Sequence, residues 1–459
     1  MRLKISLLLV LLVACATKQP ERAPLDKPIY EPPTISLREK ANKLHQRIVE
    51  DHLNEYGYLL YNVNLPLHSG NNYVNAHNSA DLPAWHGNWL MSLAFRQAVE
   101  PSPEVVNLIK VGIEGLRKNF EVTGVKGLLG RAYVYHPSDE RDLDFLQKYN
   151  PEKYPDNYWM KGQQGFWFRN GVAKGHYQGA MLGLSAIIGL DSKGYLQLPT
   201  EVRALADSTA IDLVEYLIEG DYKIRDWDGK PTNFGKLSDY RWNGQSAVQV
   251  TAMLRTCALA GSDLCKNEYT RITTDKSVAR AISIYGNAVK NVFGKILNPT
   301  NDLYKPNDTI HATSAALAHY LVADLDVDTI QAERNAKLIK RLADVAGRDR
   351  NTFFNFIYAA LSSPDNQTEL LADGMLTLKL FPDDKRDVSD NGVAELPTDR
   401  IYQIGNMKIN SHYWKTTWSE GLVATLPLPL ERTSQEYSGQ DYLGAYWMGR
   451  FFEFVSSDE

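Results

Sequence analysis

Residues 168–189 read FRNGVAKGHYQGAMLGLSAIIG, and this stretch decides the fold. Its beginning is polar and basic, whereas the rest carries apolar residues at i, i+3, i+4 and i+7, a spacing that predicts a helix with a broad buried face. Gly179, Gly183 and Gly189 each lower helix propensity by about 1 kcal/mol, so we expect a neighbouring backbone to come close there. The stretch therefore predicts a core helix whose N-terminus lies among polar residues.

The start of this helix recurs along the chain. An aromatic residue, any residue and then glycine open an apolar helix at Trp85-His86-Gly87, Tyr177-Gln178-Gly179, Trp242-Asn243-Gly244 and Tyr437-Ser438-Gly439. The spacings between these instances are unequal, which argues against a regular solenoid. A ring of unequal helical hairpins agrees better with the pattern.

Helical patterns follow one another through the chain. We expect helices at 36–55, 84–99, 102–121, 176–189, 200–219, 244–260, 268–293, 309–323, 327–346, 351–362, 366–380 and 439–453. Those that start near 84, 176, 244, 309, 351 and 439 are apolar and read as inner helices, and the others carry charges on one face, as outer helices do. Long runs of alternating Val, Ile and Thr are missing, so strands should be few and short. The sequence predicts an all-α (α/α)6 toroid built from six helical hairpins.

Long segments lead into the inner helices at 56–83, 122–175, 220–243 and 381–438. They are rich in Tyr, Trp, Asn, Asp and His, and long loops of this kind are usually functional. Exposed aromatic rings beside amides and carboxylates are typical of a carbohydrate site. We expect these loops to form a cleft on one rim of the toroid, although packing of the rings onto the barrel is the alternative at each single position.

The N-terminus reads as an export signal. Residues 1–14 combine a basic start, a short apolar run and small residues, which is typical of a secretory signal peptide and too short for a membrane span. Leu12-Val13-Ala14-Cys15 resembles the lipobox of bacterial lipoproteins. The resemblance implies cleavage before Cys15 and acylation of Cys15, with chains such as palmitate that anchor the protein stably when several are present.

The residue after Cys15 is Ala16, and by resemblance to the sorting rule of Gram-negative bacteria this implies the outer membrane, on its periplasmic side or at the cell surface. Residues 15–35 are rich in proline and predict an extended tether. No low-complexity linker interrupts the rest, so we expect 36–459 to be a single toroid domain.

Composition excludes several classes of protein. The hydrophobic content of 44% and charged content of 23% are those of a globular protein, and the net charge of −5 gives no basic footprint for nucleic acid. Cys257 and Cys265 predict a short-loop disulfide in an oxidising compartment, with two free thiols as the alternative. No Cys or His spacing matches a structural zinc site, and no phosphate or dinucleotide motif occurs, so we expect neither metal nor cofactor.

Four short pieces within roughly residues 75–300 resemble the six-hairpin glycosidase superfamily, whose (α/α)6 enzymes act on polysaccharides. They are residues 81–89, residues 122–131, His176-Tyr177-Gln178-Gly179 with Gly183, and Trp227-Asp228-Gly229 followed by Tyr240-Arg241-Trp242-Asn243-Gly244. The resemblance implies the toroid and a carbohydrate substrate. Family members carry an acidic residue just before the helix that here starts at His176, whereas this chain has Val172-Ala173-Lys174-Gly175.

Glycoside hydrolysis needs one protonated and one ionised carboxyl group. The catalytic candidates on the rim are Asp81, Asp228 and Asp239, with Asp226 and Glu420 as further carboxylates. Asp81 stands near a helix N-terminus, which lowers its pKa and favours a base; simple helix capping is the alternative. Asp228 lies in Asp-Trp-Asp-Gly, which reads equally well as a turn.

A uronate-type polysaccharide lyase needs a base such as His and a cation that neutralises the substrate carboxylate. His176 is the candidate base here, and a hydrogen-bonded core histidine is the alternative. The candidate substrate-binding residues are Trp85, His86, Arg131, Arg169, Lys174, Tyr177, Trp242, Asn243 and His412.

These patterns together predict an outer-membrane-anchored, periplasm-facing carbohydrate-active protein. We place a glycoside hydrolase acting on a polysaccharide or oligosaccharide first and a lyase second, and a non-catalytic glycan-binding or envelope scaffold lipoprotein is the third alternative. Its expected partners are a carbohydrate and, through the lipid on Cys15, a membrane.

Overall fold

The structure is a computed structural model. It describes residues 35–60, 62–64, 81–135, 159–285, 306–346, 352–381 and 435–457. The predicted signal peptide, Cys15, nearly all of the tether, and His412 lie outside the described residues, as does most of the segment 381–438.

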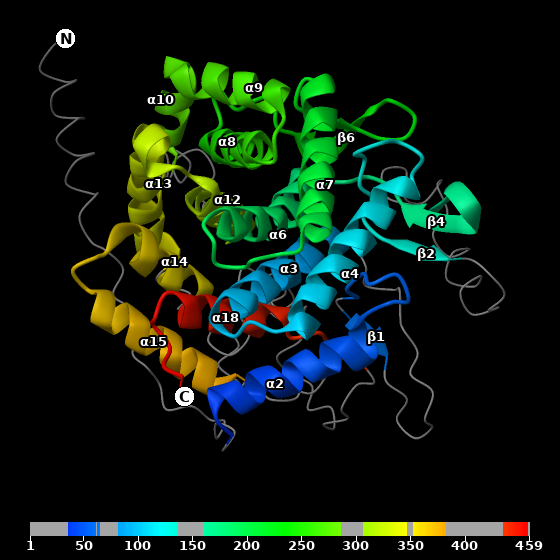
Figure 1. The fold of residues 1–459 in the computed structure, drawn as a ribbon. Coiled ribbons are helices and arrows are strands. Elements are labelled where there is room, and N and C mark those ends of the chain that lie inside the picture. The colour runs from blue at the N-terminus through cyan, green and yellow to red at the C-terminus, as the bar shows by residue number, and fades with distance from the viewer. Residues whose placement is uncertain are drawn as a thin grey trace, which may run out of the picture.

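Two concentric rings of helices make up the described part of the chain (Figure 1). The inner ring consists of α3 (Leu82–Val99), α6 (Lys174–Ser192), α8 (Gly244–Leu259), α12 (Pro306–Val322), α14 (Thr352–Ser362) and α18 (Gln440–Phe451). Each inner helix packs against the next, and α18 packs back on α3. The outer ring consists of α2 (Leu37–Arg47), α4 (Pro103–Glu121), α7 (Thr200–Glu219), α9 (Asp263–Thr274), α10 (Lys276–Ile284), α13 (Leu325–Ala346) and α15 (Gln367–Leu380). The predicted all-α (α/α)6 toroid is confirmed.

Two predicted helices differ from the observed ones. The helix expected over 36–55 is α-helical only to Arg47 and continues as the π-helix η1 (Ile48–His52). The helix expected over 268–293 begins earlier, at Asp263, and breaks at Asp275. The break follows from capping, because the Asp275 carboxylate accepts the backbone N–H of Ser277 at 2.8 Å and so starts α10.

Strands are short and antiparallel, as predicted. β2 (Tyr133–Tyr135), β4 (Phe166–Arg169) and β3 (Trp159–Lys161) form one sheet in that order, with the 3-10 turn η3 (Gln163–Gly165) between β3 and β4. β5 (Lys223–Arg225) pairs with β6 (Pro231–Lys236), and β1 (Asn62–Asn64) pairs with β7 (Gln435–Tyr437). All of them belong to the segments that lead into inner helices.

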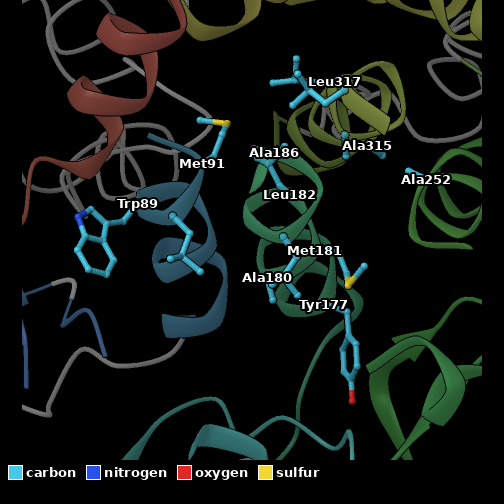
Figure 2. Close-up of a cluster of buried hydrophobic side chains, with 14 of the residues drawn as sticks. Trp89, Met91, Tyr177, Ala180, Met181, Leu182, Ala186, Ala252, Ala315 and Leu317 are labelled. Atoms are coloured by element: carbon cyan, nitrogen blue, oxygen red, sulfur yellow. The ribbon is translucent and has the colours of Figure 1, made fainter. Parts of the chain in front are cut away.

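The glycines of α6 allow it to lie directly against α3. A Cβ on Gly179 would stand 2.3 Å from the Cα of Ala84, and one on Gly183 would stand 2.6 Å from the carbonyl oxygen of Gly87. Real Cβ atoms do not approach that closely, so glycine is required at both positions. Figure 2 shows α6 between α3 and α12, with Leu182 and Ala186 among the buried side chains. The predicted close backbone approach is confirmed.

The ring closes between its first and last elements. Lys40 of α2 is fully buried, and its Nζ donates to the carbonyl oxygens of Leu378, Lys379 and Phe381 at the end of α15. The last carbonyl groups of a helix lack their full set of intrahelical N–H partners, so the ammonium group of Lys40 caps the end of α15 from a neighbouring helix. Because α2 also packs on α18, it joins the C-terminal part of the described chain.

Cys257 at the end of α8 and Cys265 in α9 form a disulfide with a Cα–Cα distance of 5.7 Å, which confirms the predicted pairing. The bond ties an inner helix to the following outer helix. No helix among the described residues is long and apolar enough to cross a membrane.

Candidate functional site

The inner helices around α6 run parallel to it. Lys174 of α6 donates its Nζ to Oε1 of Gln245 in α8 at 3.1 Å, and further along the same two helices the hydroxyls of Ser185 and Thr256 lie 2.7 Å apart. Both pairs are separated by 71 residues, which means that the two helices advance in the same direction and in constant register. The starts of α6 and α8 therefore lie at the same level.

The same relation holds between α6 and α12. A Cβ on Gly175 would stand 2.7 Å from the ring of His311 at the start of α12, and one on Gly189 would stand 2.3 Å from the carbonyl oxygen of Leu321 near its end. The N-termini of α3, α6, α8 and α12 thus meet on one face of the toroid. Each helix N-terminus carries a partial positive charge, so this face favours anions.

Asp81 and His176 lie together on this face. Asp81 is the residue before α3, and its Oδ1 lies 2.7 Å from Nε2 of His176 in the first turn of α6. Nδ1 of His176 accepts the backbone N–H of Ala173 at 2.8 Å, so the ring proton must be on Nε2 and is donated to Asp81. Both ring nitrogens of His176 are therefore engaged. The predicted role of His176 as a catalytic base is wrong on this geometry, because it orients the carboxylate instead.

Asp81 is open to solvent although its partners are not. Its side chain is 53% exposed, whereas that of His176 is 2% exposed. Partial desolvation raises the pKa of Asp81, but the hydrogen bond from His176 and the charges of His176, Arg131 and His311 lower it, and the net pKa lies below the ordinary value. Asp81 is accordingly ionised at neutral pH, in agreement with the role of base that its position predicts.

Arg131 links Asp81 to a second carboxyl group. Its guanidinium lies 3.9 Å from Oδ1 of Asp81, and its Nε donates to the carbonyl oxygen of Gly171 at 2.9 Å. The N–H of Gly171 donates to Oδ2 of Asp226 at 3.0 Å. Gly171 has a φ of 72°, in the left-handed region where glycine is favoured, and this turn aims its two polar groups at Arg131 and Asp226.

The pKa of Asp226 is shifted in the opposite direction from that of Asp81. Burial raises the pKa of its carboxyl group, and this effect outweighs the hydrogen bonds from the backbone N–H groups of Gly171 and Trp227. The side chain is nevertheless only half-buried, so solvent reaches it. Two carboxyl groups with opposite pKa shifts therefore lie at the two ends of the Arg131–Gly171 connection.

His311 is a functional candidate that the sequence analysis missed. It is in the first helical turns of α12, beside Gly175, and its charge acts on Asp81. The signal was available, because His311 is the third residue of the apolar helix predicted over 309–323, just as His176 is near the start of α6.

Two of the predicted carboxylates have structural roles instead. Asp228 lies in the exposed β5–β6 turn. Its carboxylate accepts two hydrogen bonds from Lys230, one from the backbone N–H at 3.0 Å and one from the side-chain ammonium group at 2.7 Å. Asp239 accepts the amide of Asn243 at 3.3 Å, and Asn243 in turn accepts the N–H of Gln245 at 3.1 Å to cap α8. These contacts stabilise the β5–β6 turn in the case of Asp228 and the start of α8 in the case of Asp239 and Asn243.

His86 and Tyr177, predicted to bind substrate, lie in the core. Nδ1 of His86 accepts the N–H of Leu59 at 3.0 Å, Nε2 donates to the carbonyl oxygen of Gly112 at 2.7 Å, and burial lowers the pKa of His86 to about 4. The hydroxyl of Tyr177 donates to the carbonyl oxygen of Gly127 at 2.7 Å, and Figure 2 shows its ring pointing away from the other labelled side chains of α6. Both predictions are wrong, because these residues are on the helix faces that pack against α4 and the loop after it.

The remaining predicted binding residues border the face. Arg169 ends β4 and is nearly buried, Lys174 bonds Gln245, and Trp85 is half-buried in the first turn of α3. Trp242 directly before α8 is 83% exposed. Among the described residues no group of three or more His, Cys, Asp or Glu side chains is placed to hold a metal ion.

No family model and no curated protein matches this sequence. Among solved structures, the chain is similar to the crystal structure of a sugar epimerase from a ruminal bacterium, with a TM-score of 0.48 and 12% identity, over 92% of this chain and 100% of that one. A likeness this distant carries no argument about activity.

Proposed function

We propose that this protein is a carbohydrate-active enzyme that hydrolyses glycosidic bonds, with Asp226 as general acid and Asp81 as general base. The observation that carries the proposal is the pair of carboxyl groups with opposite pKa shifts, joined through Arg131 and Gly171. Titratable groups whose surroundings push their pKa values apart are the usual mark of an acid and base pair.

In this reaction Asp226 gives its proton to the glycosidic oxygen as the bond from that oxygen to the anomeric carbon breaks. Asp81 takes a proton from the water that attacks the same carbon, so one water is consumed and both carboxyl groups return to their starting states by exchange with solvent. His176 fixes the orientation of Asp81. Arg131 connects the two carboxyl groups, because it contacts Asp81 directly and Asp226 through Gly171.

Aromatic side chains near the two carboxyl groups in the sequence, and one directly before the inner helix α8, support a sugar as the substrate. Trp227 follows Asp226 directly and is 47% exposed, and Trp242 is exposed at the start of α8. Trp85 is in the first turn of α3, which Asp81 directly precedes. Sugar faces stack on such rings, while their hydroxyls bond nearby amides and charged groups.

His311 supports a second candidate, a uronate lyase. An imidazole titrates near neutral pH and serves as a base, while Arg131 and Lys174 would neutralise the substrate carboxylate. His311 would remove the proton next to the carboxylate, a carbon–carbon double bond would form as the glycosidic C–O bond breaks, and the departing oxygen would take up a proton from the protonated His311 or from water. The product is unsaturated, which hydrolysis never gives.

A panel of polysaccharides that includes peptidoglycan and uronates tests the proposal. Hydrolysis predicts new reducing ends without the ultraviolet absorbance of unsaturated products, and absorbance together with reducing ends would favour the lyase. Binding without any cleavage would replace both with the glycan-binding scaffold.

We also propose that the protein is anchored in the outer membrane through an acylated Cys15, as the lipobox resemblance implies. Wild-type protein should fractionate with membranes, and Cys15→Ala should remain unprocessed. A Cys15→Ala protein that is processed and soluble as efficiently as the wild type would rule out the anchor.

A further inference from the structure

A group of buried polar atoms lies one helical turn beneath the candidate site. Gln178 of α6 and Gln249 of α8 are 1% and 0% exposed, and neither amide has a hydrogen-bond partner among the described residues. In the first turn of α8, Nε2 of Gln245 and the hydroxyl of Ser246 are likewise buried without a partner. Each such group costs about 1–3 kcal/mol when it is left unpaired, so their accumulation in one place indicates a use.

The register of the helices brings the two glutamines together. Gln178 is four residues after Lys174, and Gln249 is four residues after Gln245, the pair that is joined across the two helices at 3.1 Å. Residues four apart lie on the same helix face, so Gln178 and Gln249 occupy the next level of the same contact face. From this spacing we infer that their side chains lie beneath the Lys174–Gln245 hydrogen bond.

The chemistry of the two amides defines what they bind. Each carboxamide offers an N–H donor and a carbonyl acceptor, and each sugar hydroxyl offers the same two functions. An anion would leave the carbonyl groups unpaired, and a cation would leave the N–H groups unpaired. Adjacent hydroxyls of a neutral ring can satisfy both amides.

The level below is closed by the core. Figure 2 shows Leu182 and Ala186 of α6, Ala252 of α8 and Ala315 of α12 in the buried cluster, and all four side chains are fully buried or nearly so. A ligand that reaches the glutamines cannot pass further into the toroid, so only one end of it can contact them.

We propose that Gln178 and Gln249 bind adjacent hydroxyls on the terminal sugar of the glycan, which enters the toroid end-on after displacing the Lys174–Gln245 contact. The inference rests on the proposed function for its substrate class, and it adds that the enzyme acts at chain ends.

Near-isosteric substitution by methionine tests it with the full-length protein. Gln178→Met and Gln249→Met should raise the melting temperature of the free protein, by about 2 °C, because each removes unpaired buried polar atoms. The matched control is Gln97→Met: Gln97 is also buried, but its Oε1 accepts the N–H of Ser102 at 2.9 Å, so its loss should lower the melting temperature.

The ligand probes are glucose, galactose, N-acetylglucosamine and glucuronate, each tested for its shift of the melting temperature. At least one should stabilise the wild type, and both glutamine variants should lose that shift. Lower melting temperatures for both variants would assign the amides a structural role and overturn the proposal, as would a retained shift or no shift by any of the four sugars. If a sugar stabilises the wild type and not the two variants, but the wild type cleaves no glycan, hydrolysis and action at chain ends would be overturned. The binding of a terminal sugar by Gln178 and Gln249 would stand.

Discussion

Asp81→Asn is expected to lower kcat/KM for a cleaved glycan by about 10²–10⁴-fold, because general acid–base groups contribute factors of that size. Asp226→Asn should cost a similar factor. Both variants should still be stabilised by sugar, because an asparagine keeps the shape and one acceptor oxygen of the aspartate. Measured rates for the two variants, beside binding by thermal shift, check this expectation.

Asp228→Asn is the matched control for these two variants. Its carboxylate pairs with Lys230 in an exposed turn, so its turnover should stay within about two-fold of the wild type, in line with the small contribution of surface ion pairs. Equal activity of Asp81→Asn and wild type would remove Asp81 from the mechanism. Loss of activity in Asp228→Asn comparable to that in Asp226→Asn would mean that the wrong carboxyl group of the turn has been assigned.

Gly179→Ala is expected to lower the free energy of unfolding by about 3 kcal/mol or more. The added Cβ would stand 2.3 Å from the Cα of Ala84, and backbone atoms cannot give way as a flexible side chain can. The contact joins α3 and α6, so the two helices that carry Asp81 and His176 would separate. Urea unfolding monitored by circular dichroism measures the effect.

Gly194 offers the control for this substitution. It follows α6 in a turn with a φ of 81°, and nothing lies within 4 Å of an added Cβ. Gly194→Asn should therefore change stability by less than about 1 kcal/mol, because asparagine tolerates the left-handed region. Equal stability of Gly179→Ala and wild type would show that the α3–α6 contact is looser than described.

The helical hairpins could be predicted because each helix carries its own signals. Ser36 and Glu39 form a capping box at the start of α2, and the apolar pattern of α6 marks a helix buried on nearly every side. Gly179 and Gly183 indicated a close neighbour, although not which one. That partner is defined by the packing of α3, which a single sequence does not specify.

The site was predicted less completely for the same reason. The aromatic-x-Gly pattern places His86 near the start of an inner helix, but only the contact with Gly112 of α4 determines that it faces the core. Asp226 and Asp228 are two residues apart in one turn, and the bond from Gly171 selects Asp226. Tertiary contacts of this kind leave no local trace in the sequence.

The pH dependence of kcat/KM for a cleaved glycan, measured for wild type and Asp226→Asn, tests the assignment of acid and base most directly. Hydrolysis needs Asp226 protonated and Asp81 ionised, so wild-type activity should fall as the pH rises through the raised pKa of Asp226 and as it drops through the lowered pKa of Asp81. The residual activity of Asp226→Asn should lose the fall on the alkaline side. An unchanged alkaline fall in Asp226→Asn would contradict the account.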